Sequence, residues 1–213
     1  MKRKTASFTG SRPIFTGSPS IVPGGFNLDV VNQKFNVGDT IPAGTLAIKD
    51  EVKRTVQVIK TAKVVEIDAE SSNKKIELYV DEFYEPCFAV GDAVLAAKSI
   101  TGTFANAPKI TAIEKKGNYY AITLSAAISG LAKNDTIIEV IDKSSNAAVR
   151  GDANSVAIAD VYVGEFETSV DVTEDTMQYA LYENRVPPIP DAQKDSTKQY
   201  LKGNVHVRLT KSH

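Results

Sequence analysis

Residues 35–41 read Phe35-Asn36-Val37-Gly38-Asp39-Thr40-Ile41, and this stretch sets the pattern for the rest of the chain. The pattern returns as Phe88-Ala89-Val90-Gly91-Asp92-Ala93-Val94 and, more loosely, as Leu131-Ala132-Lys133-Asn134-Asp135-Thr136-Ile137. In each copy an apolar anchor precedes a tight polar turn, after which the next apolar run begins. The copies therefore predict a repeated strand entry in a small barrel or sandwich. Gly-Asp is also a common turn dipeptide, so coincidence is the alternative to a structural repeat.

The predicted turns rest on residue types that suit a sharp bend. Gly38 and Gly91, like the asparagine of the third copy, tolerate a positive φ. Asp39 and Asp92 can accept a hydrogen bond from a nearby backbone N–H and hold the bend. We therefore interpret these four residues as structural turn residues that carry no chemistry.

Composition sets broad limits on what the protein does. The chain has 213 residues, of which 42% are hydrophobic and 24% charged, with a net charge of −1. These values are typical of a globular protein, and they give no global field that attracts nucleic acid or a membrane surface. The single Cys87 cannot form an internal disulfide, and its apolar neighbours predict a small buried side chain.

Alternating apolar residues predict an all-β fold with little helix. We expect two small β-barrel or sandwich modules with an extended N-terminal arm. The expected divisions are the arm at 1–34, a first β module at 35–98, a second at 99–142, and C-terminal strands with a Pro-rich segment at 143–213 that complete the β body. Hairpins are predicted over residues 62–80 and 109–124.

The C-terminal part carries two weaker predictions. Asp191 can cap a short helix over 192–202, with a mobile loop as the alternative. Residues 204–209 alternate, and we expect them to form a last strand that pairs with an early one.

The N-terminal arm is rich in Pro, Gly and Ser, yet it also contains recurring apolar residues. A solvated linker does not need such residues, whereas an arm that lies across another surface does. Four of its basic residues are Lys2, Arg3, Lys4 and Arg12. The candidate docking faces are the acidic stretch 160–183 of a neighbouring subunit and an acidic surface of another partner protein. The predicted partner-binding residues are Arg12, Ile14, Phe15, Ile21, Val22 and Phe26. A disordered tail is the alternative.

Residues that carry chemistry do not form a recognisable set in the sequence. The two histidines are His206, on an alternating run, and the terminal His213, and no metal-ligand spacing surrounds them. Phosphate-binding and nucleophile motifs are also missing. Adjacent acids such as Glu174 and Asp175 leave a hydrolase as a remote alternative. We therefore expect no catalytic residue, no metal and no cofactor.

The layout resembles head decoration and other accessory capsid proteins of tailed bacteriophages. The resemblance rests on the Pro/Gly-rich arm, on the strand-rich modules, and on Val37-Gly38-Asp39-Thr40-Ile41-Pro42-Ala43-Gly44-Thr45-Leu46 at the start of the β body. It implies a non-enzymatic virion protein, made in the host bacterial cytoplasm, that binds the outer surface of the capsid and stabilises it. The implied partners are the major capsid protein or another virion protein and further copies of the chain, with a trimer as one option, rather than nucleic acid or a membrane.

A second interpretation is a carbohydrate- or host-surface-binding β module of a phage fibre or tail. It requires an aromatic-lined groove, for which Tyr119-Tyr120 and Phe83-Tyr84 are the candidates. Strand packing is the simpler explanation of both pairs.

Overall fold

A computed structural model describes residues 13–22, 24–81, 83–176 and 179–212. Within this part of the chain the regular structure is β, with no α-helix, which confirms the expected all-β class. The strands are β1 (Phe26–Leu28), β2 (Thr40–Ile41), β3 (Leu46–Asp50), β4 (Thr55–Val58), β5 (Thr61–Asp68), β6 (Lys75–Leu78), β7 (Ala93–Ala96), β8 (Ile110–Lys116), β9 (Tyr119–Leu124), β10 (Thr136–Lys143), β11 (Asn146–Ala148), β12 (Ser155–Val156), β13 (Val161–Tyr162), β14 (Ser169–Val170), β15 (Leu181–Tyr182) and β16 (Leu209–Thr210). The short 3₁₀ helices are η1 (Phe104–Asn106), η2 (Glu183–Arg185) and η3 (Asp191–Gln193).

The first lobe is a barrel built on the strand order β12-β3-β4-β1-β14. The segments that continue β12 and β14 close the ring, because Thr173 N–H donates to the Val156 carbonyl at 3.1 Å and Ile158 N–H donates to the Asp171 carbonyl at 3.0 Å. Its interior holds Phe26, Leu28, Ile41, Ala47, Val56, Val58, Val170 and Val172. Closure leaves no free strand edge between these elements.

The second lobe is also a closed barrel. Strands β10, β5, β6, β9 and β8 pair in that order, and β7 pairs with β10. The ring closes between β7 and β8, where Gly91 N–H donates to the Ile110 carbonyl at 2.7 Å and Ile110 N–H donates to the Asp92 carbonyl at 2.8 Å. The β5–β6 and β8–β9 pairs confirm both predicted hairpins.

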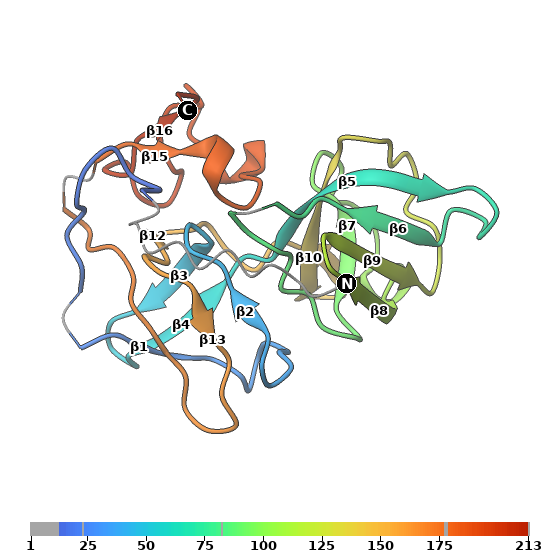
Figure 1. The fold of residues 1–213 in the computed structure, drawn as a ribbon, viewed down its shortest axis with the longest axis horizontal. Coiled ribbons are helices and arrows are strands. Elements are labelled where there is room, and N and C mark those ends of the chain that lie inside the picture. The colour runs from blue at the N-terminus through green and yellow to red at the C-terminus, as the bar shows by residue number, and fades with distance from the viewer. Residues whose placement is uncertain (1–12, 23, 82, 177–178, 213) are drawn as a thin grey trace.

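The two barrels are nested in sequence, as the ribbon colours of Figure 1 show. All strands of the second barrel lie between β4 and β12 of the first. The expected boundary at residues 98/99 therefore falls inside the second barrel, since β5, β6 and β7 precede it and β8, β9 and β10 follow it. Both barrels contain the same turn motif and similar apolar runs, so local pattern does not reveal which strands pair.

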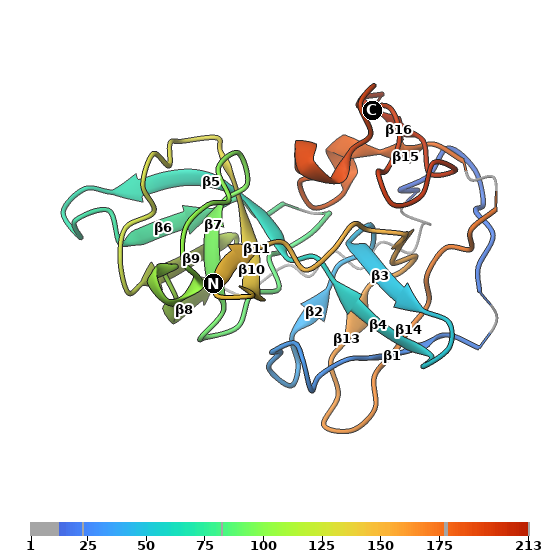
Figure 2. The same ribbon diagram turned by 180° about the vertical axis from the view of Figure 1, so that it is seen from behind.

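A C-terminal segment covers the place where the barrels meet, and Figures 1 and 2 show it above the first barrel. Here β15 and β16 pair in parallel, and Phe15 of the arm bridges Leu181. The core at this place joins three parts of the fold: Leu46 and Val156 of the first barrel, Ile138 and Val140 of the second, and Val186, Leu201 and Val207 of the C-terminal segment. We term it the shared core.

The helix predicted over 192–202 does not form, and only η3 is helical there. Gln193 is buried, where its side chain accepts a hydrogen bond from Ala153 N–H at 2.8 Å. Asp195 accepts hydrogen bonds from the N–H groups of Gln199 and Tyr200, which stabilises a local loop instead of a helix.

The predicted strand over 204–209 is also mostly wrong. Residues 204–207 form a turn in which Val207 N–H donates to the Asn204 carbonyl, and only Leu209–Thr210 is a strand. This strand, β16, pairs with β15 and not with an early strand.

Candidate functional site

The three copies of the opening motif adopt the same turn. Gly38, Gly91 and Asn134 have φ values of 87°, 90° and 72°, as their residue types predict. In each copy the aspartate N–H donates to the carbonyl three residues earlier, at 3.0 Å for Asp39 and at 3.1 Å for Asp92. The aspartate side chain in turn accepts a backbone N–H from that same earlier residue: Asn36 at 3.1 Å, Ala89 at 2.8 Å and Ala132 at 2.7 Å. The turn roles of the four predicted residues thus have matching geometry.

Each of the three aspartates also binds a lysine from a distant part of the chain, a contact that the sequence pattern does not predict. The pairs are Asp92 with Lys60 at 2.7 Å, Asp39 with Lys115 at 3.0 Å and Asp135 with Lys98 at 2.6 Å. Their burial differs strongly: the Lys60 side chain is 0% exposed, that of Lys115 33%, and that of Lys98 53%. One motif therefore supplies the same contact in three environments.

The Lys60–Asp92 pair sits where the chain passes from the first barrel into the second. Lys60 lies between β4 and β5, and its ammonium also donates to the Lys34 carbonyl and lies 4.3 Å from the centre of the Phe35 ring. An ammonium group without partners at this depth would be strongly unfavourable, so its contacts hold the 34–35 segment against the second barrel.

A second buried cluster joins the barrels beside this pair. Arg150 binds Glu139 at 2.8 Å, and both side chains are 7% exposed. Glu139 also accepts the Gln33 side-chain N–H at 2.9 Å, while Gln33 exchanges hydrogen bonds with the backbone of Val58 in β4. Gln33, Glu139 and Arg150 thus connect the segment after β1, the second barrel and the return to β12.

Cys87 lies close to this joint, and the structure agrees with its predicted burial. Its side chain is 4% exposed. Burial raises the pKa of the Cys87 thiol to about 12, although the nearby Lys60 ammonium acts in the opposite direction. A thiol with this pKa stays protonated at neutral pH and is a poor nucleophile.

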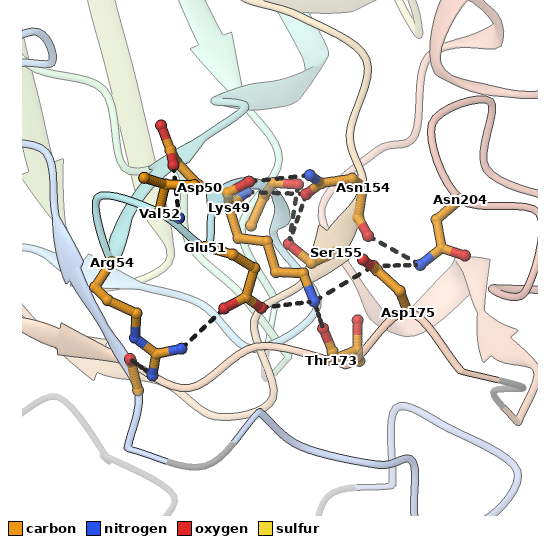
Figure 3. A network of polar contacts seen from close by, with 12 residues as sticks. Lys49, Asp50, Glu51, Val52, Arg54, Asn154, Ser155, Thr173, Asp175 and Asn204 are labelled. Carbon is orange, nitrogen blue, oxygen red and sulfur yellow. Dashed lines mark hydrogen bonds and ion pairs between the residues drawn. The ribbon is translucent and has the colours of Figure 1, made fainter.

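A separate polar network centres on Lys49 of β3, shown in Figure 3. The Lys49 ammonium lies 3.3 Å from Asp175 and 3.6 Å from Glu51, and it donates to the Thr173 carbonyl at 3.1 Å. Asn204 of the C-terminal segment donates to the same Asp175 carboxylate at 3.3 Å. The network therefore ties the first barrel to the C-terminal segment.

The predicted partner-binding residues are largely inside the chain itself, which corrects their expected role. Ile14, Phe15, Val22 and Phe26 are between 1% and 8% exposed, whereas Ile21 is 45% exposed. Arg12 lies outside the described residues. A side chain buried in its own core offers little surface to a partner, so these four residues stabilise the chain's own fold.

The arm nevertheless docks on the stretch that we expected, but within its own chain. Thr16 N–H donates to the Ala180 carbonyl at 2.9 Å, and Val22 N–H donates to the Val172 carbonyl at 3.2 Å. These acceptors belong to the acidic stretch 160–183, in which Asp175 is paired with Lys49 and Glu183 with Lys194. The described arm is therefore an integral part of the β body.

Two hollows on the described surface are candidate places for a small ligand. The larger hollow is lined by Ile67, Asn73 and residues 127–131, and a smaller open one by Glu66, Asp68, Lys75, Glu77 and Tyr119. Across the described ranges, no group of three or more His, Cys, Asp or Glu side chains has the geometry of a metal site. In the same part of the chain, no helix has the length and hydrophobicity needed to cross a membrane.

The comparisons with known proteins give no match from which a function could be carried over. No family model matches the sequence, and neither the curated proteins nor the solved structures contain a match.

Proposed function

We propose that this chain is a non-enzymatic structural protein of a phage virion that binds the outer surface of the capsid and stabilises it. The observation that carries the proposal is the construction of the β body as two closed barrels joined by buried polar contacts and a shared core. Such a body transmits force between its ends without opening a strand edge, as a protein that braces a shell must do.

The joint between the barrels supports this function. A swinging linker would expose its polar groups to water, whereas here Lys60, Asp92, Glu139 and Arg150 are buried and paired. A clamp that spans neighbouring subunits resists their separation only when its two ends move together. The turn Pro42-Ala43-Gly44-Thr45-Leu46 that carries the resemblance lies at the same joint, because Gly44 packs directly against Val186 of the shared core.

One observation favours the second candidate, a carbohydrate- or host-surface-binding module. Tyr119 lies beside Glu66, Asp68 and Glu77 in the smaller hollow, and an aromatic ring next to carboxylates suits a sugar ligand. Of the other aromatic candidates, Tyr120 is 1% and Tyr84 8% exposed, so these two fit this function less well, while Phe83 is half-buried.

The test is co-sedimentation of the purified chain with virion shells that lack it. We expect saturable binding and a shell that withstands a higher temperature after binding. A chain that stays in the supernatant at every concentration, or that binds immobilised glycans and not shells, would contradict the capsid proposal.

A further inference from the structure

Five exposed apolar residues belong to two neighbouring segments at one end of the first barrel. We term this group the apolar rim: Val30, Val31, Val37, Tyr162 and Phe166. Val31 is 90% exposed, Phe166 87% and Tyr162 74%. Single exposed apolar residues are ordinary on a protein surface, but several of them on adjacent segments make those segments a candidate interaction site.

Backbone contacts hold the two segments that carry these residues side by side. Leu28 N–H donates to the Thr168 carbonyl at 2.8 Å, and Gly38 N–H donates to the Val163 carbonyl at 2.8 Å. The loop between β13 and β14 is therefore held between the segment that follows β1 and the segment that precedes β2. Figures 1 and 2 show this loop projecting from the barrel on the side away from the C-terminal segment.

Phe166 occupies the middle of that loop, between Glu165 and Glu167. Gly164 N–H donates to the Thr168 hydroxyl at 3.1 Å, which closes the base of the loop. Within the described part of the chain, neither glutamate makes a hydrogen bond or an ion pair. A projecting aromatic ring between two unpaired carboxylates has the form of an anchor for a pocket of opposite charge.

We propose that the apolar rim docks on the capsid protein, with Phe166 inserted into an apolar pocket that is bordered by lysine or arginine side chains. This inference rests on the proposed function and adds the contact surface and the chemistry of its receptor. Electrostatic complementarity argues against a second copy of the chain as the occupant. In a symmetric contact the acidic loops would face each other, and like charges at an interface are unfavourable.

The experiment measures binding of full-length variants to virion shells that lack the chain. The variants are Phe166→Ser and the pair Glu165→Gln/Glu167→Gln. Val52→Ser is the matched control, because Val52 is also an apolar residue of a surface turn, is 95% exposed, and lies outside the apolar rim between β3 and β4. Urea unfolding midpoints verify that each variant is folded.

We expect Phe166→Ser to weaken shell binding at least about tenfold, as loss of an interface anchor does. The glutamine pair should weaken it by a smaller factor that shrinks as salt is added, and Val52→Ser should bind like the wild type. If the wild type binds but Phe166→Ser binds equally well, the proposed docking role of the apolar rim is overturned and the capsid proposal stands.

Two further outcomes separate the alternatives. If the wild type does not bind shells, both proposals fall together. In the second outcome, light scattering shows that the wild type self-associates and that Phe166→Ser abolishes this association while shell binding is unchanged. In that case the apolar rim binds a second copy of the chain, and the proposal of a capsid receptor for it is overturned.

Discussion

The joint between the barrels and the turn that precedes β10 contain the same Asp–Lys contact. At the joint, Asp92 holds Lys60 with both side chains almost fully buried, whereas before β10 Asp135 holds Lys98 with the lysine 53% exposed. The geometry is nearly identical, but the energetic consequences are not. An exposed pair exchanges water for a partner at little gain, whereas removing one member of a buried pair leaves a charge with no solvent.

The largest expected effect comes from breaking the buried pair. Lys60→Ala should lower the free energy of unfolding by about 3–5 kcal/mol, because it leaves the Asp92 carboxylate buried and unpaired. Lys98→Ala, the matched change in the exposed pair, should cost less than about 1 kcal/mol. Urea denaturation of both variants measures the difference. Equal losses would show that burial does not distinguish the two copies.

Two glycines at positive φ allow a similar comparison, between a turn packed against the core and a turn that faces open space. Gly44 has φ 85° and a Cβ there would meet Val186 at 2.1 Å, while Gly38 has φ 87° and open space around it. Alanine at either position introduces left-handed strain of about 1–2 kcal/mol. Gly44→Ala should cost about 1–3 kcal/mol more than Gly38→Ala through overpacking of the shared core. Thermal unfolding of the two variants tests this, and a Gly38→Ala loss as large as that of Gly44→Ala would refute it.

The copy at Asp39 is intermediate between the two extremes. Its partner Lys115 belongs to β8 of the second barrel and is 33% exposed. Asp39→Ala removes two hydrogen bonds from Asn36, one from its backbone and one from its side chain, and a partly exposed ion pair, so we expect a loss of about 1 kcal/mol. The unfolding midpoint should lie between those of Lys60→Ala and Lys98→Ala. A midpoint below that of Lys60→Ala would show that the loss of stability does not increase with the burial of the ion pair.

The smallest expected effect is a pH dependence at the exposed pair. The hydrogen bond from Lys98 lowers the pKa of Asp135, opposed by slight burial. A carboxyl with a lower pKa in the folded state stabilises the fold above its unfolded pKa of about 3.9 and loses this contribution as pH falls. The stability difference between wild type and Asp135→Asn should therefore shrink between about pH 6 and pH 3. A difference that grows on acidification would contradict this assignment.

The turns were predictable from sequence, because their determinants are local. Glycine or asparagine at positive φ and an aspartate that binds the backbone three residues earlier both fall within one short motif. The lysine partners were not predictable, since Lys60 and Lys98 lie 32 and 37 residues from their aspartates in sequence, and Lys115 lies 76 residues from Asp39. Only the fold brings these residues together.

The N-terminal arm shows the same limit of prediction from sequence. Its apolar residues indicated docking, and the described arm does bond to the backbone of stretch 160–183, but within its own chain and not on the neighbouring subunit or other partner that we expected. Pattern alone does not distinguish a face on the same chain from one on a neighbour, so Phe15 and Phe26 were assigned to a partner instead of the core. The exposed Phe166, which carries the further inference, lies between two acids in a segment whose sequence stands out only by its charge.

Electron cryo-microscopy of shells with and without the chain tests most directly whether the two barrels brace a shell as one rigid body. We predict added density on the outer face of the shell that fits both barrels in their fixed relative orientation, with the β13–β14 loop toward the shell. Identical maps with and without the chain, or density for one barrel while the other is averaged away, would contradict this proposal.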